Sequence, residues 1–231
     1  IEWLDDYTYT MESKFKNQEF AKIVYTKLVD ELVARGTLRA AIFATSSTEG
    51  TEELFEAVRS AGIGAYIGKV AMDCNAPKKI IEDRKTAMRG VSYLYEKYKC
   101  DPLVRPIITP RFAPTSSPEQ LKELGRFAEQ FDLPVQSHLN ECREEIEWVE
   151  SLFPEEKSYS EVYNKYNLFG QTPTLMAHCV YMKESEIELA KKNGVFFVHR
   201  PDSNIKGRLG IATFKDYLRK KIKIGLGSDV A

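Results

Sequence analysis

The sequence predicts an α/β fold of the (β/α)8 TIM-barrel type, with seven of the eight strands in this chain. Strand-like and helix-like segments alternate along almost all of its 231 residues. The strand-like segments are mostly continuous apolar runs, which is typical of a parallel sheet buried on both faces. Reactive residues follow several of these strands, at the end where barrel active sites form. An open doubly wound sheet is the alternative, but no glycine-rich phosphate loop follows any strand.

Seven segments have the length and apolar character of strands. We expect them at 38–44, 62–70, 104–109, 133–138, 174–178, 195–199 and 222–229. Seven strands are one short of a closed eight-stranded barrel.

Apolar residues at three- and four-residue spacing predict helices between these strands. We expect them at 17–34, 52–60, 78–99, 118–131, 142–153, 183–193 and 212–221. Ser117 and Pro118 form a helix-start signal, and Gly194 is a typical helix end. We expect loops at 1–11 and in the tyrosine-rich segment 159–166.

Composition excludes several classes of partner. The 33 basic and 34 acidic residues give a net charge of −1, which argues against nucleic acid or an anionic membrane. The longest apolar runs fall well below the roughly 20 residues of a membrane helix, and the first residues do not resemble a signal peptide. The 4 scattered cysteines predict free thiols in a reducing compartment, hence a cytoplasmic protein.

Three residues at strand ends have side chains that bind metals. His138, His178 and Asp229 each end a different predicted strand. The third histidine, His199, also ends a strand. A lone histidine in such a place is more often structural, but zinc needs a few nitrogen and oxygen ligands that converge on one point. The sequence therefore predicts a metal site at His138, His178 and Asp229.

Glu141 follows His138 by three residues, at the start of a predicted helix. It is near enough to carry protons at a metal site, although a carboxylate in a first helical turn is also explained by the helix dipole. For the neighbouring Glu144, Glu145 and Glu147 we expect only a solvated helix face.

Arg111 lies just past a strand end, directly before Phe112. A guanidinium there can form paired hydrogen bonds to a planar substrate while the aromatic ring stacks on it. An ordinary surface arginine is the alternative. Cys142 and Cys179 flank candidate residues but have no base partner of their own, which argues against a cysteine nucleophile.

Four short motifs carry a family resemblance: Gln136–Glu141, Met176–His178, His199–Asn204 and Gly225–Ala231. In order and spacing the chain resembles the amidohydrolase superfamily, and within it the guanine deaminases. The resemblance covers essentially the whole chain and extends to Glu2–Leu4, Gly68–Asn75, Thr109–Phe112 and Tyr159–Asn167.

The resemblance implies a zinc-dependent hydrolase, with iron as the other metal that imidazole suits. The implied reaction is deamination of guanine to xanthine and ammonia. The implied metal ligands are His138, His178 and Asp229; the catalytic residues are Glu141 as proton shuttle and Asp229 as base; and the substrate-binding residues are Arg111, Phe112, Gln136 and His199. The implied partners are a small purine substrate and a second copy of the chain, which the tyrosine-rich segment is expected to contact.

Two features depart from the family pattern. No His-x-His motif is present, and we expect its strand and the flanking small β-domain to precede Ile1, so that residues 1–231 form one partial barrel. Arg200–Asp202 stands where the family usually has Cys-Pro-Asn, and Lys206–Gly210 also differs. Two alternatives therefore stay open: a deaminase of another amino-purine or related heterocycle, and an inactive barrel fragment that serves as a binding or assembly module.

Overall fold

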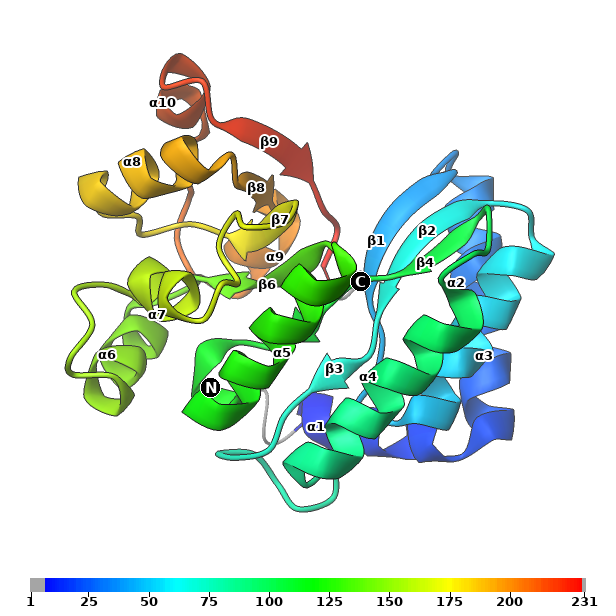
Figure 1. Cartoon of the computed structure of the whole chain (residues 1–231). Helices are drawn as coiled ribbons and strands as arrows, with labels where there is room; N and C mark the ends of the chain where they lie inside the picture. The colour runs from blue at the N-terminus through cyan, green and yellow to red at the C-terminus, as the bar shows by residue number, and fades with distance from the viewer. Residues whose placement is uncertain (1–6, 230–231) are drawn as a thin grey trace. The chain divides into compact units, whose positions relative to one another are not determined.

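The computed structural model describes residues 7–229, and the chain divides into two compact units, Ile1–Thr109 and Pro110–Ala231 (Figure 1). The Glu2–Leu4 motif and the last two residues, Val230 and Ala231, lie outside the described residues. Within 7–229, no helix combines the length and apolar character needed to cross a membrane.

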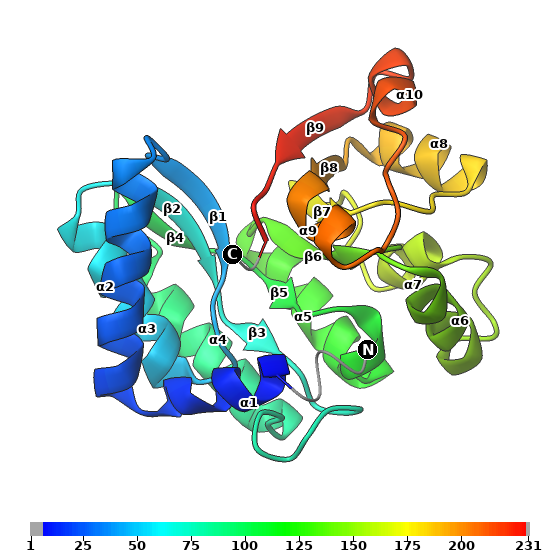
Figure 2. The same ribbon diagram turned by 180° about the vertical axis from the view of Figure 1, so that it is seen from behind.

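The first unit is built on a parallel sheet with the strand order β1-β2-β4. Its strands are β1 (Arg39–Phe43), β2 (Gly64–Gly68) and β4 (Val104–Pro106). The short β3 (Val70–Ala71) follows β2 in the chain, and the short β5 (Thr109–Pro110), at the boundary of the two units, follows β4. Its helices are α1 (Tyr9–Glu12), the 3-10 turn η2 (Ser13–Lys16), α2 (Gln18–Ala34), α3 (Thr48–Ser60) and α4 (Arg84–Tyr98). The three long helices lie on one side of the sheet (Figures 1 and 2), where the rings of Phe55 and Tyr98 stack 4.1 Å apart in the core.

The second unit contains a four-stranded parallel sheet whose strands follow one another in chain order (Figure 2). They are β6 (Val135–Leu139), β7 (Thr174–His178), β8 (Phe196–His199) and β9 (Lys223–Leu226). The helical segments are η3 (Ala113–Thr115), α5 (Pro118–Phe131), α6 (Arg143–Leu152), α7 (Tyr159–Lys165), α8 (Glu184–Asn193), α9 (Pro201–Lys206) and α10 (Phe214–Arg219). Leu139 pairs with His178, and His199 with Leu226, so the carboxyl ends of all four strands meet at one edge.

All seven predicted strands are present, because long apolar runs leave little choice of register for a strand buried on both faces. Helix starts were harder to predict. The helix expected from residue 78 begins at Arg84, because Asp83 caps it by accepting a hydrogen bond from the Thr86 amide at 3.1 Å. The helix expected from residue 52 begins at Thr48, where Ser47 caps the first turn.

Two predicted loops are wrong where the structure describes them. In the loop expected at 1–11, of which residues 1–6 lie outside the described residues, α1 begins at Tyr9, and the tyrosine-rich segment contains α7. In α7, Tyr159 and Tyr163 lie one turn apart and are both buried, so an amphipathic helix of two turns is enough to cover them. The short helix α9 was not predicted; it begins with Pro201, a residue well suited to a first helical position.

At Gly125, α5 packs too closely against the backbone of Tyr166 to leave room for a side chain. A β-carbon built there would overlap the backbone carbonyl of Tyr166. We expect Gly125→Ala to lower the free energy of unfolding by about 1–3 kcal/mol, as overpacking does, although alanine is the better helix former. Urea unfolding measures this, with the exposed Lys122→Ala as the matched control. A stability equal to or above that of the parent would contradict this close packing.

Candidate active site

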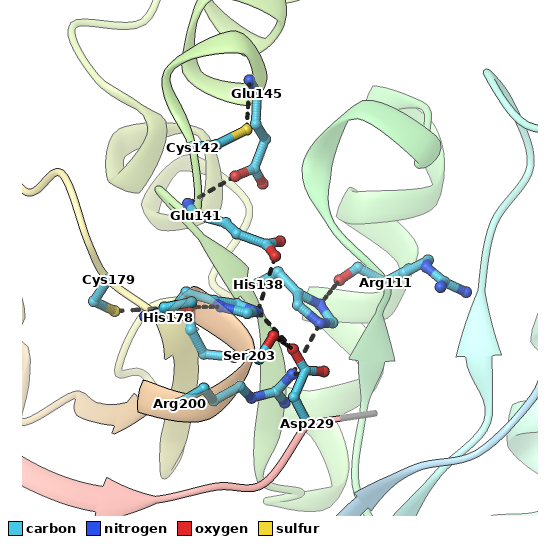
Figure 3. A network of polar contacts seen from close by, with 12 residues as sticks. Arg111, His138, Glu141, Cys142, Glu145, His178, Cys179, Arg200, Ser203 and Asp229 are labelled. Carbon is cyan, nitrogen blue, oxygen red and sulfur yellow. Dashed lines mark hydrogen bonds and ion pairs between the residues drawn. The ribbon is translucent and has the colours of Figure 1, made fainter. Parts of the chain in front are cut away.

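His138, His178 and Asp229 come together at the carboxyl edge of the β6-β7-β8-β9 sheet (Figure 3). One ligand atom from each lies within 4.8 Å of the other two. Within the described part of the chain, this is the one group of three or more histidine, cysteine or acidic side chains that is suited to hold a metal ion. The two imidazole rings lie face to face, with centroids 5.4 Å apart and planes 27° from parallel. The structure thus brings together the three residues predicted from the strand ends.

The backbone at these strand ends is held in unusual conformations. Asn140, His178, Cys179 and Asp229 all have left-handed backbone angles, with φ between 50° and 73°. A residue other than glycine in this conformation costs roughly 1–3 kcal/mol of strain, and the conformation persists only where the surrounding structure enforces it. One restraint is the hydrogen bond from the Cys179 amide to the Leu139 carbonyl, at 2.9 Å. The loops after β6 and β7 are therefore fixed to each other beside the candidate ligands.

Hydrogen bonds fix which nitrogen of each histidine faces the cluster. His138 Nδ1 lies 2.6 Å from the Arg111 carbonyl oxygen, and His178 Nδ1 lies 2.8 Å from Asn204 Oδ1. Both oxygens are acceptors, so each Nδ1 donates a proton and each Nε2 keeps its lone pair. His178 Nε2 is buried and has no hydrogen-bond partner among the described residues. Burial lowers the pKa of both rings, which keeps them in the neutral form that binds metals.

Two carboxylates face the same nitrogen. Glu141 Oε1 lies 3.6 Å from His178 Nε2, and Asp229 Oδ2 lies 3.7 Å from it. Burial raises the pKa of Glu141. Burial also acts to raise the pKa of Asp229, but the Arg200 guanidinium and the Ser203 hydroxyl outweigh it, so that pKa lies below its ordinary value. Neighbouring carboxyl groups with pKa values moved in opposite directions suit one proton carrier and one ionised base.

Arg200 lies inside this cluster, a position that was not predicted from the sequence. Its Nη1 donates to Asp229 Oδ1 at 2.6 Å and lies 3.5 Å from His138 Nε2. Ser203 adds a second donor to Asp229, at Oδ2. The available signal was the position of Arg200 directly after His199, at the same end of a strand as the predicted ligands.

The expectation that Glu145 lies on a solvated helix face is wrong, whereas Glu144 and Glu147 are exposed as predicted. Glu145 is 3% exposed, and its Oε2 accepts the backbone N–H of Glu141 at 2.8 Å. A carboxylate that accepts an N–H at the start of its own helix satisfies a donor that would otherwise have no partner. Glu145 therefore fixes the backbone of Glu141, the candidate proton carrier.

The buried tyrosines of α7 extend this support. Tyr159 donates to Glu145 Oε1 at 2.9 Å, and Tyr163 donates to the His138 carbonyl at 2.9 Å. Tyr163 is also within 2.8 Å of the Ser137 hydroxyl. Tyr159 and Tyr163 are both buried inside their own unit, and the contact of this segment with a second copy stays a prediction.

Glu145 should make stability depend on pH. Burial raises its pKa from 4.5 to about 7, so the folded chain binds a proton that the unfolded chain has released in this range. Its contribution to stability is complete below pH 4.5 and is lost as the pH rises through about 7. In Glu145→Gln, we expect this decline, up to about 1.4 kcal/mol per pH unit, to disappear. Urea unfolding across the range tests this, with the exposed Glu147→Gln as control; an unchanged slope would contradict it.

Arg111 and Phe112 follow β5, and their described contacts are structural. The Arg111 carbonyl holds His138, while its side chain extends away from the two histidines (Figure 3). Phe112 is buried, with its ring edge-on to Trp148 at 5.9 Å. Their roles in substrate binding stay predictions.

Gln136 and His199 occupy strands of the same sheet. Gln136 is buried within β6. His199 ends β8, and its ring lies 5.3 Å from that of Phe214. It is not part of the ligand group found within 7–229. Their substrate roles also stay predictions.

The two cysteines beside the cluster, Cys142 and Cys179, are kept unreactive by their burial. Burial raises the pKa of Cys142 to about 11 and that of Cys179 well above its ordinary value. Near neutral pH both are therefore thiols, and the thiolate is the nucleophilic form.

Known proteins resemble this chain over its whole length. The model of the amidohydrolase family matches residues 2–231. The chain is 39% identical to a guanine deaminase of Dictyostelium discoideum and 33% identical to one of Escherichia coli, each over 100% of this chain and 52% of the relative. A crystal structure of guanine deaminase from C. acetobutylicum with bound guanine superposes with a TM-score of 0.98 at 44% identity, covering 100% of this chain and 55% of that one.

The chain thus spans about half the length of the curated relatives it matches. The family match and the structural similarity confirm the predicted (β/α)8 fold class and the resemblance on which it was based. The chain belongs to the amidohydrolase family.

Proposed function

We propose that this chain forms part of a metal-dependent hydrolase that converts guanine and water to xanthine and ammonia. The observation that carries the proposal is the convergence of His138, His178 and Asp229, with Glu141 beside them, at one sheet edge. The similarity to guanine deaminases, one of them with guanine bound, supports the choice of substrate.

The donor set fits a zinc ion. Two neutral imidazole nitrogens and a carboxylate oxygen are typical zinc ligands, and the lone pair of the buried His178 Nε2 is directed at the cluster without a hydrogen-bond partner among residues 7–229. His138, His178 and Asp229 would hold the metal; iron suits the same donors. When bound, the metal would supply Lewis-acid chemistry that makes water more acidic near neutral pH.

The two carboxyl groups divide the proton transfers. Asp229, ionised beside Arg200, accepts a proton from the attacking water. Glu141, with its raised pKa, carries a proton to the purine ring and to the departing amino group. Water thus supplies the oxygen at C2 of the purine, and the amino group leaves as ammonia.

The remaining roles complete the proposal. Arg111, Phe112, Gln136 and His199 would contact the purine, since all four lie on or directly after strands that end near the cluster. We also propose a cytoplasmic homodimer without nucleic-acid or membrane partners. The four free cysteines and the balanced charge support the location and the partner classes.

A substrate panel tests the proposal. Ammonia release is measured from guanine, adenine and cytosine with the complete gene product. We expect release from guanine and not from the other two bases. Release from adenine or cytosine alone would contradict the assignment of guanine, and no release from any base by a folded, zinc-loaded protein would contradict deamination of these bases.

A further inference from the structure

Arg200 contacts atoms that a metal ion would bind. Its Nη1 donates to Asp229 Oδ1 at 2.6 Å and lies 3.5 Å from His138 Nε2, so it meets two of the three candidate ligands (Figure 3). The side chain is only 9% exposed, which places the guanidinium within the cluster and not at its rim. The other oxygen of Asp229 accepts a hydrogen bond from Ser203.

A guanidinium in this place opposes a divalent cation in two ways. It stays positively charged at any pH that the protein tolerates, and charge repulsion is strong where water is largely excluded. It also neutralises Asp229, the one carboxylate of the ligand group. A metal ion must therefore either break the ion pair of Arg200 with Asp229 or bind while Asp229 stays paired with the guanidinium.

We infer that Arg200 lowers the metal affinity of this site through its ion pair with Asp229. The inference rests on the metal site of the proposed function, but it does not depend on the substrate. A purely supporting role for Arg200, in which it orients Asp229 toward the metal, predicts the opposite sign for the effect of its removal.

Zinc titration of the metal-stripped complete gene product separates these roles. The parent and Arg200→Met compete for zinc with a chromophoric chelator at one pH. We expect Arg200→Met to bind zinc at least about tenfold more tightly, because the variant lacks the positive charge that pairs with Asp229 and repels the metal ion. The control is Arg219→Met, which removes an exposed arginine paired with Asp216 at 3.1 Å and should leave the zinc affinity unchanged.

Equal or weaker zinc binding by Arg200→Met, or no binding by either protein, would overturn the inference. Arg200→Lys keeps the positive charge, so its zinc affinity should stay close to that of the parent. This variant separates the effect of the charge from that of the side chain's shape. If Arg200→Met folds poorly, Arg200→Gln and the zinc-induced rise in Tm provide the same comparison. The tighter binding should vanish when His138→Ala is added, which shows that the zinc occupies this cluster. Failure of guanine turnover would leave the zinc result interpretable, since no substrate is used.

Discussion

Replacing Glu141 with glutamine should lower kcat for guanine deamination by about 10²–10⁴, with little change in KM. Glutamine has the same shape but cannot accept and return a proton. Glu141 lies 3.6 Å from His178 Nε2, and burial raises its pKa, which favours proton transfer near neutral pH. The loss should therefore fall on the chemical step and not on binding.

Steady-state kinetics of the complete gene product measure both constants. Glu144→Gln is the matched control, because Glu144 belongs to the same acidic run but is exposed. It should retain the parent values. A Glu141→Gln variant with the parent kcat would show that another group carries the proton.

His178→Ala should weaken zinc binding more than any change in the groups that support the ligands. It removes Nε2, a buried nitrogen without a hydrogen-bond partner among the described residues. Asn204→Ala leaves that nitrogen in place and removes only the acceptor at Nδ1, 2.8 Å away. Loss of such a supporting group typically costs about 10–100-fold in metal affinity. We therefore expect the order parent, Asn204→Ala, His178→Ala, from tightest to weakest.

Zinc competition on the three proteins gives this order directly. Near-UV circular dichroism confirms that each variant is folded before its affinity is compared. If His178→Ala kept the affinity of the parent, the cluster would not be the metal site. If Asn204→Ala lost as much as His178→Ala, the hydrogen bond at Nδ1 would be as important as the ligand itself.

The strands and their terminal residues could be predicted because both follow from local pattern. A continuous apolar run of strand length in an α/β chain is typical of a buried strand. The residue at the end of that run therefore lies at the carboxyl edge of the sheet. His138, His178 and Asp229 were therefore found without knowledge of tertiary contacts.

The supporting residues could not be predicted, because their burial depends on partners far away in the sequence. Glu145 resembles its exposed neighbours until its contact with Tyr159 is known. Tyr159 and Tyr163 read as part of a polar loop because the segment around them is short and charged. Arg200 gave two weak signals, its position directly after His199 and its departure from a family pattern. Neither reveals its contacts with His138 and Asp229, which lie far away in the sequence.

The most direct test combines xanthine formation and zinc content in the complete gene product and its His138→Ala variant. We predict that the parent contains zinc and converts guanine to xanthine, and that the variant, although folded, does neither. Xanthine formed at the parent rate by the variant, or none formed by a folded and zinc-loaded parent, would contradict the assignment of this cluster to guanine deamination.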